Sequence, residues 1–283
     1  MELNFFTFIF LILGGAFTGI LGALLGIGGG IFLVPFLVFF AHLPMHNAVA
    51  TSLVCLIAVS TAVASINLKR NLVNLRLGLT LDLSTTIGAI LGGTLAGLLS
   101  GSWLMRIFGV AAFVISFVMA FKKEKISSSI TENNNLLDKN PQNTGLNYIY
   151  FDHAEKKNIS YIVKNLPLGV SVSVIAGTIS GLIGIGGGVI QVPILNLSCG
   201  VPIRAAAATS NFMIGFTAVA SAFIYYGRGQ LNPVIAGVVV LGVLIGSVTG
   251  TYLNKKIKAR SIRLLFAFVL FVVAIQMLLR SFH

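Results

Sequence analysis

Charged residues are scarce in this sequence, and their scarcity decides the class of protein. Only 9% of the 283 residues are Asp, Glu, Lys or Arg, whereas soluble domains carry roughly 25%. Hydrophobic residues make up 56% of the chain. A chain of this composition cannot cover a water-facing surface, so we expect lipid to be its main solvent.

Acidic residues are the rarest charged type, with seven Asp and Glu against nineteen Lys and Arg, which gives a formal net charge of +12. Nucleic-acid binding usually needs a basic stripe interleaved with aromatic residues, and the sequence has no such stripe. We therefore expect no nucleic-acid partner. In a membrane protein, the basic residues are expected to mark cytoplasmic loops.

Cysteine is also scarce. Cys55 and Cys199 both lie in apolar segments, so neither a disulfide framework nor a cysteine-based metal site is expected. The apolar segments contain no His/Cys/acid cluster and no Ser-His pairing that would support catalysis. The sequence therefore predicts a protein without metal or cofactor that is not an enzyme.

Long apolar runs are what the chain has in abundance. Eight of them have about the 20 residues needed to cross a bilayer core. They lie near 5–25, 46–66, 77–100, 103–121, 165–185, 205–226, 232–253 and 261–280. Two shorter runs, 31–41 and 189–199, rise only about 16 Å each as helices. The sequence leaves open whether these short runs span the membrane or re-enter it.

A glycine-rich stretch occurs twice, 158 positions apart. Residues 19–35 read GILGALLGIGGGIFLVP, and residues 177–193 read GTISGLIGIGGGVIQVP. The register continues through Thr51-Ser52, which matches Thr209-Ser210. We predict an all-α polytopic membrane protein with two repeats, each of four long transmembrane helices plus one short or re-entrant helix after the GIGGG break.

The predicted domain organisation follows from this repeat. Residues 1–121 form the first membrane repeat and 165–283 the second. Between them, 122–164 is rich in Lys, Asn, Ser and Glu and is expected to be a hydrophilic linker. The stretches YIYF from Tyr148 and ISYIV from Ile159 flank a polar turn in it, which predicts a small β-hairpin.

The basic loops change places between the repeats. The loop 69–76 carries three basic residues, whereas its counterpart in the second repeat holds only Arg228. Conversely, 255–263 carries five basic residues and its counterpart 100–103 has none. Under the positive-inside rule this pattern predicts inverted-topology repeats in a bacterial inner membrane. Both termini are then expected outside the cytoplasm, and 122–164 inside it.

The GIGGG segments are the first candidate site. A helix broken by glycine survives in lipid only where protein or a water-filled cavity satisfies its free backbone groups. Free N–H groups beside a helix N-terminus can bind an anion. The alternative is that the glycines only allow close helix packing. The residues concerned are Gly26, Gly28, Gly29, Gly30, Gly184, Gly186, Gly187 and Gly188.

Hydroxyl and amide side chains begin the long helices after the short runs, namely Thr51, Ser52, Thr209, Ser210 and Asn211. They can bond a substrate oxygen, or they can bond their own backbone as helical Ser and Thr often do. The sequence alone leaves both roles open.

Asp82 is the one acidic residue in any predicted span. An ionisable residue inside a membrane is a functional candidate, for example in proton coupling. Its position near the end of a span and near Arg76 makes a structural salt bridge or an interfacial acid the alternative.

Glycines at small-xxx-small spacing are expected to pack helices closely. They are Gly88, Gly92, Gly93, Gly97, Gly101, Gly242, Gly246 and Gly250.

The duplicated GIGGG…VP, followed by Pro and Ala-x-Ala-Thr-Ser, resembles the sulfite exporter TauE/SafE family, also called the toluene sulfonate uptake permeases. The resemblance implies an integral membrane transporter for sulfite, thiosulfate, sulfonates or other organosulfur anions, working by alternating access. A channel-like anion conduit or a transporter of another small anionic metabolite is the alternative. The cargo, the direction, the coupling ion and the oligomeric state, a homo-oligomer included, stay open.

Overall fold

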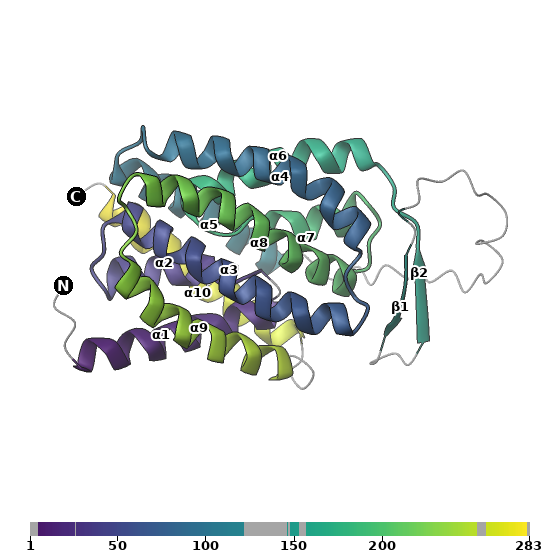
Figure 1. The fold of residues 1–283 in the computed structure, drawn as a ribbon, viewed down its shortest axis with the longest axis horizontal. Helices are drawn as coiled ribbons and strands as arrows, with labels where there is room; N and C mark the ends of the chain where they lie inside the picture. Colours follow the sequence, from purple (N-terminus) through teal and green to yellow (C-terminus); the bar gives the residue numbers. More distant parts are fainter. Residues whose placement is uncertain are drawn as a thin grey trace.

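The computed structural model describes residues 5–25, 27–121, 146, 148–152, 157–253 and 259–281. Within these ranges the chain forms ten helices and one two-stranded sheet (Figure 1). The helices are α1 Phe5–Leu25, α2 Gly30–Phe39, α3 Met45–Lys69, α4 Leu75–Ala96, α5 Gly101–Phe121, α6 Leu166–Ile183, α7 Gly188–Leu197, α8 Ile203–Gly227, α9 Pro233–Leu253 and α10 Ala259–Arg280.

Several helices have the length and composition of membrane spans. Six of those described, α1, α3, α4, α6, α8 and α9, are long and apolar enough to cross a membrane, and shorter apolar stretches occur in α5 and α10. Large apolar side chains point outward; Phe6 is 85% and Leu98 83% exposed. Lipid would cover such a surface, whereas water would not. The all-α polytopic membrane class is confirmed.

The two short helices double back along the helices that precede them. Gly29 lies against Gly22 at the turn between α1 and α2, and the rings of Phe10 and Phe40 lie 6.4 Å apart further along. In the second half, Gly187 lies beside Ser180 of α6. Ten helical residues rise only about 15 Å. Both short runs therefore turn back along the helix before them instead of continuing in its direction.

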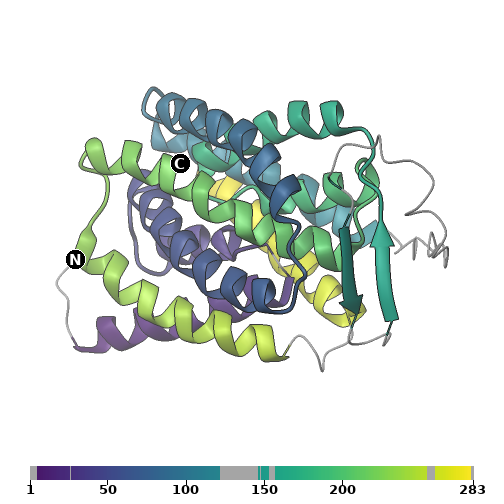
Figure 2. The ribbon, with the colours of Figure 1, turned by 45° about the vertical axis from the view of Figure 1, so that its right-hand side comes forward.

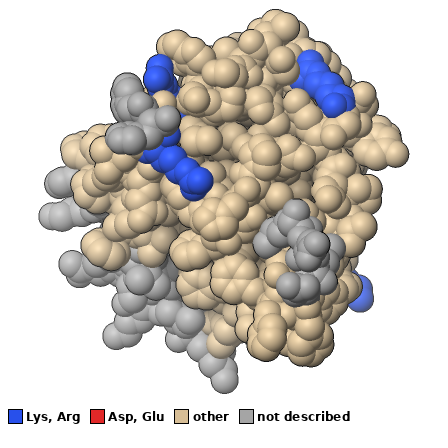
Figure 3. Space-filling view, turned by 90° about the vertical axis from the view of Figure 1, so that its left-hand side faces the viewer, with Lys and Arg blue, Asp and Glu red and all other residues tan. Residues whose placement is uncertain are grey.

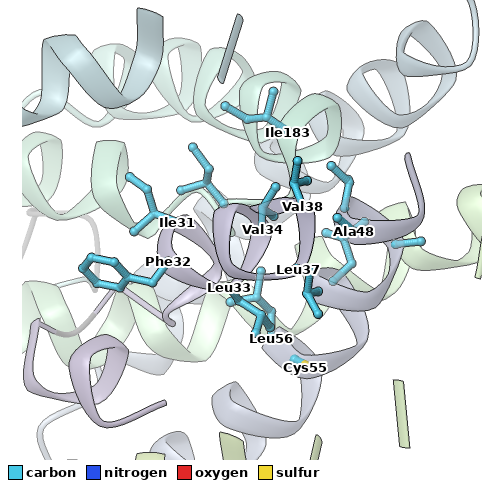
Figure 4. Close-up of a cluster of buried hydrophobic side chains, with 14 of the residues drawn as sticks. Ile31, Phe32, Leu33, Val34, Leu37, Val38, Ala48, Cys55, Leu56 and Ile183 are labelled. Atoms are coloured by element: carbon cyan, nitrogen blue, oxygen red, sulfur yellow. The ribbon is translucent and has the colours of Figure 1, made fainter. Parts of the chain in front are cut away.

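Eight of the ten residues of α2 are buried, and Figure 4 shows several of them in a cluster of apolar side chains. Its side chains lie between Ile183 of α6 and Leu56 and Cys55 of α3. A helix so enclosed has its free backbone groups covered by protein, which is the condition for a broken helix in lipid.

Glycines join the long helices in closely packed pairs. A Cβ on Gly242 or Gly250 of α9 would overlap or crowd the carbonyl oxygen of Ile12 or Ile20 of α1, respectively. Because residue numbers rise together along the contact, α1 and α9 run parallel. The helices α4 and α6 meet in the same way through Gly88 and Gly92. The close contacts at these glycines agree with the helix packing that small-xxx-small spacing predicts.

The helix pairs are equivalent when the two halves are exchanged. The pair α1–α9 corresponds to α6–α4, and α3 packs on α8 as α5 packs on α10. Figure 1 places the start of α1 and the end of α10 at one end of the bundle, the terminal end, and the β-strands at the other, the hairpin end. Inversion of the repeats across a membrane remains a prediction that these pairings support.

The strands β1 Tyr148–Asp152 and β2 Lys157–Tyr161 form an antiparallel pair in which Tyr148 lies opposite Tyr161. Tyr150 and Tyr161 are buried in one cluster with Leu77 of α4 and Leu195 of α7. The hairpin thus packs on the ends of membrane helices (Figure 2). The division into domains at 121 and 165 stays a prediction.

The terminal end is viewed face-on in Figure 3. Lys and Arg side chains occur there at separate places, and no Asp or Glu is visible among the described residues.

Candidate functional site

Both GIGGG segments leave the helical conformation through glycines. The φ angles are 80° at Gly28 and 85° at Gly29, and 86° at Gly186 and 66° at Gly187. Residues with a Cβ rarely adopt these values. The predicted breaks are therefore present in both halves. Gly26, also predicted for the site, lies outside the described residues.

The two breaks meet, although they lie far apart in the sequence. Gly30 is so close to Gly184 that a Cβ on it would overlap the Gly184 carbonyl oxygen. Ser52 Oγ donates to this same oxygen at 2.9 Å. A Cβ on Gly188 would lie 3.3 Å from the Ile27 Cα. We call this place, where residues 27–30 meet residues 184–188, the break centre.

Backbone donors collect at the break centre. The backbone hydrogen bonds between described residues include none from the N–H groups of Gly28, Gly29, Gly186 or Gly187. The helices α2 and α7 also begin here, so the positive ends of two helix dipoles point at one place. Such an arrangement favours an anion without any basic side chain.

Polar side chains beside the second break lack partners. Ser210 Oγ donates to Gln191 Oε1 at 3.2 Å, but Gln191 Nε2 has no partner among the described residues, and neither has Ser180 Oγ. Both residues are at most 2% exposed. A buried polar group without a partner costs about 1–3 kcal/mol, so both atoms are candidates to bond a ligand.

Sequence reasoning missed Gln191 and Ser180 because it followed what the two repeats share. The equivalent positions hold Leu33 and Gly22. The signal that could have found them is the difference between the copies: a glutamine in an apolar half-helix, and a serine where the other copy has glycine.

The predicted residue Thr209 is occupied elsewhere. Its Oγ1 accepts a hydrogen bond at 3.1 Å from the N–H of Asn74, which precedes α4 at the hairpin end. The Asn74 Nδ2 in turn donates to Leu146 O at 3.0 Å and to Tyr161 Oη at 3.3 Å. Burial raises the pKa of the Tyr161 phenol, which therefore stays neutral. Thr209 thus connects α8 to the loop under the hairpin.

The equivalent residue in the first half has no such bond. Thr51 is buried, and its Oγ1 has no partner among the described residues. The position equivalent to Asn74 is Asn232, which is exposed and caps α9.

Asn211, also predicted for the site, is buried and accepts from Ser60 Oγ through its backbone carbonyl.

The break centre is closed in this conformation. Side chains of Leu56 and Ile214 lie against both Gly28 and Gly186. A hollow remains beside Gly28–Gly30, lined also by Thr18 and Cys55, but it is too small to hold a water molecule. An anion would therefore reach the centre only after helices move.

Asp82 is buried where α4 packs on α8, and its hydrogen-bond partners among the described residues lie outside the break centre. Its Oδ1 accepts from Thr85 Oγ1 at 3.2 Å and from Thr217 Oγ1 at 3.3 Å. Within the described residues these are its side-chain partners, so the salt bridge with Arg76 that the sequence allows is not formed. Among all the residues that the structure describes, no three His, Cys, Asp or Glu side chains come together as metal ligands.

A helical membrane protein with two short helices that meet at glycine breaks has the architecture of a membrane transporter. A model of the family described as sulfite exporter TauE/SafE matches residues 11–277. The chain belongs to this family, so the resemblance seen in the sequence is confirmed.

Individual relatives agree with this assignment. The chain is 25% identical to the probable membrane transporter protein YunE of Bacillus subtilis, over 96% of this chain and 97% of that protein. It is 37% identical to sulfite exporter TauE/SafE family protein 5 of Arabidopsis thaliana, over 32% of this chain and 20% of that protein. A probable membrane transporter protein of Methanocaldococcus jannaschii is 31% identical over 38% of this chain and 43% of its own length. No solved structure matches the chain.

Proposed function

We propose that this protein is a secondary transporter that carries a small anion across the membrane by alternating access. The anion is sulfite or an organosulfur compound such as a sulfonate or thiosulfate. It binds at the break centre and is released after the helices around that centre have moved.

One observation carries the proposal: among the described residues, two buried side-chain donors without partners lie near backbone N–H groups that donate no backbone hydrogen bond. Ser180 lies beside Gly187, and Gln191 lies in the first turn of α7, whose positive end also points at this break. The oxygens of sulfite, thiosulfate and sulfonates are compact, negatively charged acceptors. Hydrogen bonds to charged acceptors are roughly twice as strong as neutral ones, which would offset the cost of keeping these donors unpaired.

The relatives support the substrate class by name only. YunE is called a membrane transporter, and the Arabidopsis relative a sulfite exporter. We extend the second name to this chain as a proposal because an anion fits the donors at the break centre.

The protein is proposed to lie in a bacterial plasma membrane with the terminal end outside and 122–164 in the cytoplasm. The swap of basic loops between the halves supports this orientation. An Asn232→Cys variant, with the native cysteines replaced by alanine, tests it. A membrane-impermeant thiol reagent is expected to label this cysteine in intact cells, and labelling only after lysis would reverse the orientation.

Transport itself is tested by reconstitution into liposomes with radiolabelled sulfite, thiosulfate and a C2 sulfonate. Uptake of at least one anion is expected to exceed that of empty liposomes and to saturate with concentration. Uptake that rises without saturation would instead indicate a conduit. No uptake of any of the three anions would refute the proposed substrate class.

A further inference from the structure

We propose that Asp82, Thr85 and Thr217 form a proton-binding site between α4 and α8, separate from the break centre. This inference rests on the transport proposed above and names the ion that is coupled to it. The proton binds when the Asp82 carboxylate takes it up as a carboxyl group, and it leaves as the carboxylate forms again.

The geometry offers hydrogen bonds to both protonation states. Thr217 Oγ1 lies 3.3 Å from Asp82 Oδ1 and 3.1 Å from the Met213 carbonyl oxygen. Thr85 Oγ1 lies 3.2 Å from the same Oδ1 and 3.0 Å from the Asp82 carbonyl oxygen. Each hydroxyl has one hydrogen, so it can serve only one acceptor at a time.

The two hydroxyls can therefore act as a switch. When Asp82 is ionised, both donate to the carboxylate. When Asp82 is protonated, both turn to the carbonyl oxygens of their own helices, and their lone pairs can accept the carboxyl O–H. Neither state leaves a threonine hydroxyl without an acceptor, and no heavy atom has to move. This property distinguishes the site from a threonine that bonds only its own helix.

The surroundings of Asp82 favour a proton as the charge that neutralises its carboxylate. An ionised carboxylate in a membrane costs about 3 kcal/mol or more unless a cation offsets it. The helix α6, which packs on α4, has no titratable residue. On α8, Tyr225 bonds the carbonyls of Gly181 and Leu182. Arg228 bonds those of Gly93 and Thr94, at the far end of α4.

Three further titratable groups lie on or near α4 and α8. Arg76 precedes Asp82 on α4 but is exposed, Arg204 at the start of α8 is exposed, and Cys199 lies near Leu81 beside Gly169. Within the described residues, none of them pairs with the Asp82 carboxylate. Protonation is then the direct way to neutralise it.

The equivalent helix pair, α3 with α9, shows that helix packing at this place does not require these polar groups. The positions equivalent to Asp82, Thr85 and Thr217 hold Val240, Val243 and Val59. The contact between α3 and α9 is thus built from apolar residues at the positions where the equivalent contact between α4 and α8 has polar ones. A polar trio that the fold does not need is best explained by a ligand, and the ligand that fits is a proton.

The proton-binding site lies at a contact between α4 and α8 that the proposed alternating-access movement would change. The bond between Thr217 and Asp82 crosses from α8 to α4, as does the bond between Thr209 and the residue before α4, Asn74. Movement that separates Asn74 from Thr209 also strains the Asp82 contact. The charge on Asp82 therefore biases the closed conformation, which is the requirement for coupling.

Infrared difference spectroscopy of the protein in liposomes tests proton binding without any substrate. The wild-type protein is expected to show a carboxyl C=O band that titrates with pH and is lost in Asp82→Asn. In Thr217→Val the midpoint of this band should move to higher pH, because the carboxylate loses a donor. Thr80→Val is the matched control, since Thr80 is exposed on the same helix and bonds only Arg76 O. It should behave as wild type.

Transport assays with the same variants test coupling. A gradient of one pH unit is expected to drive about tenfold accumulation of the transported anion when one proton moves per anion without net charge. Asp82→Asn should abolish this accumulation while anion exchange without a gradient stays within about twofold of wild type, the spread we allow for structural effects.

The outcomes separate the two proposals. A missing band, a band that survives in Asp82→Asn, or accumulation driven by a sodium gradient in place of a pH gradient would overturn the proton site and leave transport standing. A titrating band in a protein that exchanges none of the three anions would overturn the proposed substrate class and leave the proton site standing.

Discussion

At the scale of single residues, Gln191 is where the two copies of the motif differ in a way that bears on substrate binding. Its Nε2 has no partner among the described residues, and the first copy has Leu33 at this position. We expect Gln191→Leu to raise the KM for anion uptake about tenfold or more, since a hydrogen bond to a charged group contributes about 1.5–3 kcal/mol. The melting temperature should stay close to that of wild type, because removal of the unpaired Nε2 offsets the loss of the Ser210 hydrogen bond to Oε1.

The control for this variant is Gln276→Leu, which makes the same chemical change at an exposed position of α10. Its uptake kinetics and melting temperature should match those of wild type. If Gln191→Leu also keeps the wild-type KM, the second break is not where the anion binds.

The glycine breaks could be predicted from sequence because their cause is local. Three successive glycines disfavour a helix, and five of the glycines at the two breaks have the positive φ that suits them. The roles of the hydroxyls could not be predicted, because they depend on how helices are rotated. Thr209 and Ser210 are neighbours in sequence, yet one bonds Asn74 and the other bonds Gln191.

At the scale of elements, the β-hairpin closes one end of the bundle. Tyr161 accepts from the Asn74 side chain, and Asn74 holds Thr209 through its backbone. We expect Tyr161→Phe to loosen this closure by about 1 kcal/mol, which corresponds to about fivefold more opening. Cys199 is fully buried in the same cluster, so its rate of labelling by a thiol reagent in a Cys55→Ala background reports the opening.

The matched control for the hairpin is Tyr226→Phe, which removes a hydroxyl from an exposed tyrosine of α8. It should leave the labelling rate of Cys199 unchanged. Equal rates in both variants would mean that the hairpin packs on the bundle without holding it closed.

The elements themselves were largely predictable, and their directions were less so. Apolar runs of about 20 residues mark most helices, and alternating aromatic residues mark the hairpin. A ten-residue apolar run does not reveal whether it continues across or turns back. The structure decides this through contacts such as Phe10 with Phe40, far apart in sequence and invisible in the pattern.

At the scale of the whole molecule, the two halves are related by exchange of equivalent helices, but their polar contacts differ. The hairpin end is joined by Asn74 and Thr209. At the terminal end the equivalent Asn232 and Thr51 are apart: Thr51 Oγ1 has no partner among the described residues, and Asn232 is exposed. Alternating access requires that the two equivalent halves adopt different states in any one conformation. The opposite conformation should exchange these contacts.

This exchange can be trapped by cross-linking in a protein whose native cysteines are replaced by alanine. The pair Asn74→Cys and Thr209→Cys should form a disulfide at once, because these residues already touch. The pair Thr51→Cys and Asn232→Cys should form it slowly without substrate and faster with the transported anion, since the anion lets the protein visit the opposite conformation. Either disulfide should stop uptake, and reduction should restore it.

Closure of the second pair at the same rate with and without anion would show that its approach is unrelated to transport. Failure to close under any condition would mean that the halves do not exchange roles, and the movement would then have to come from the short helices α2 and α7 themselves.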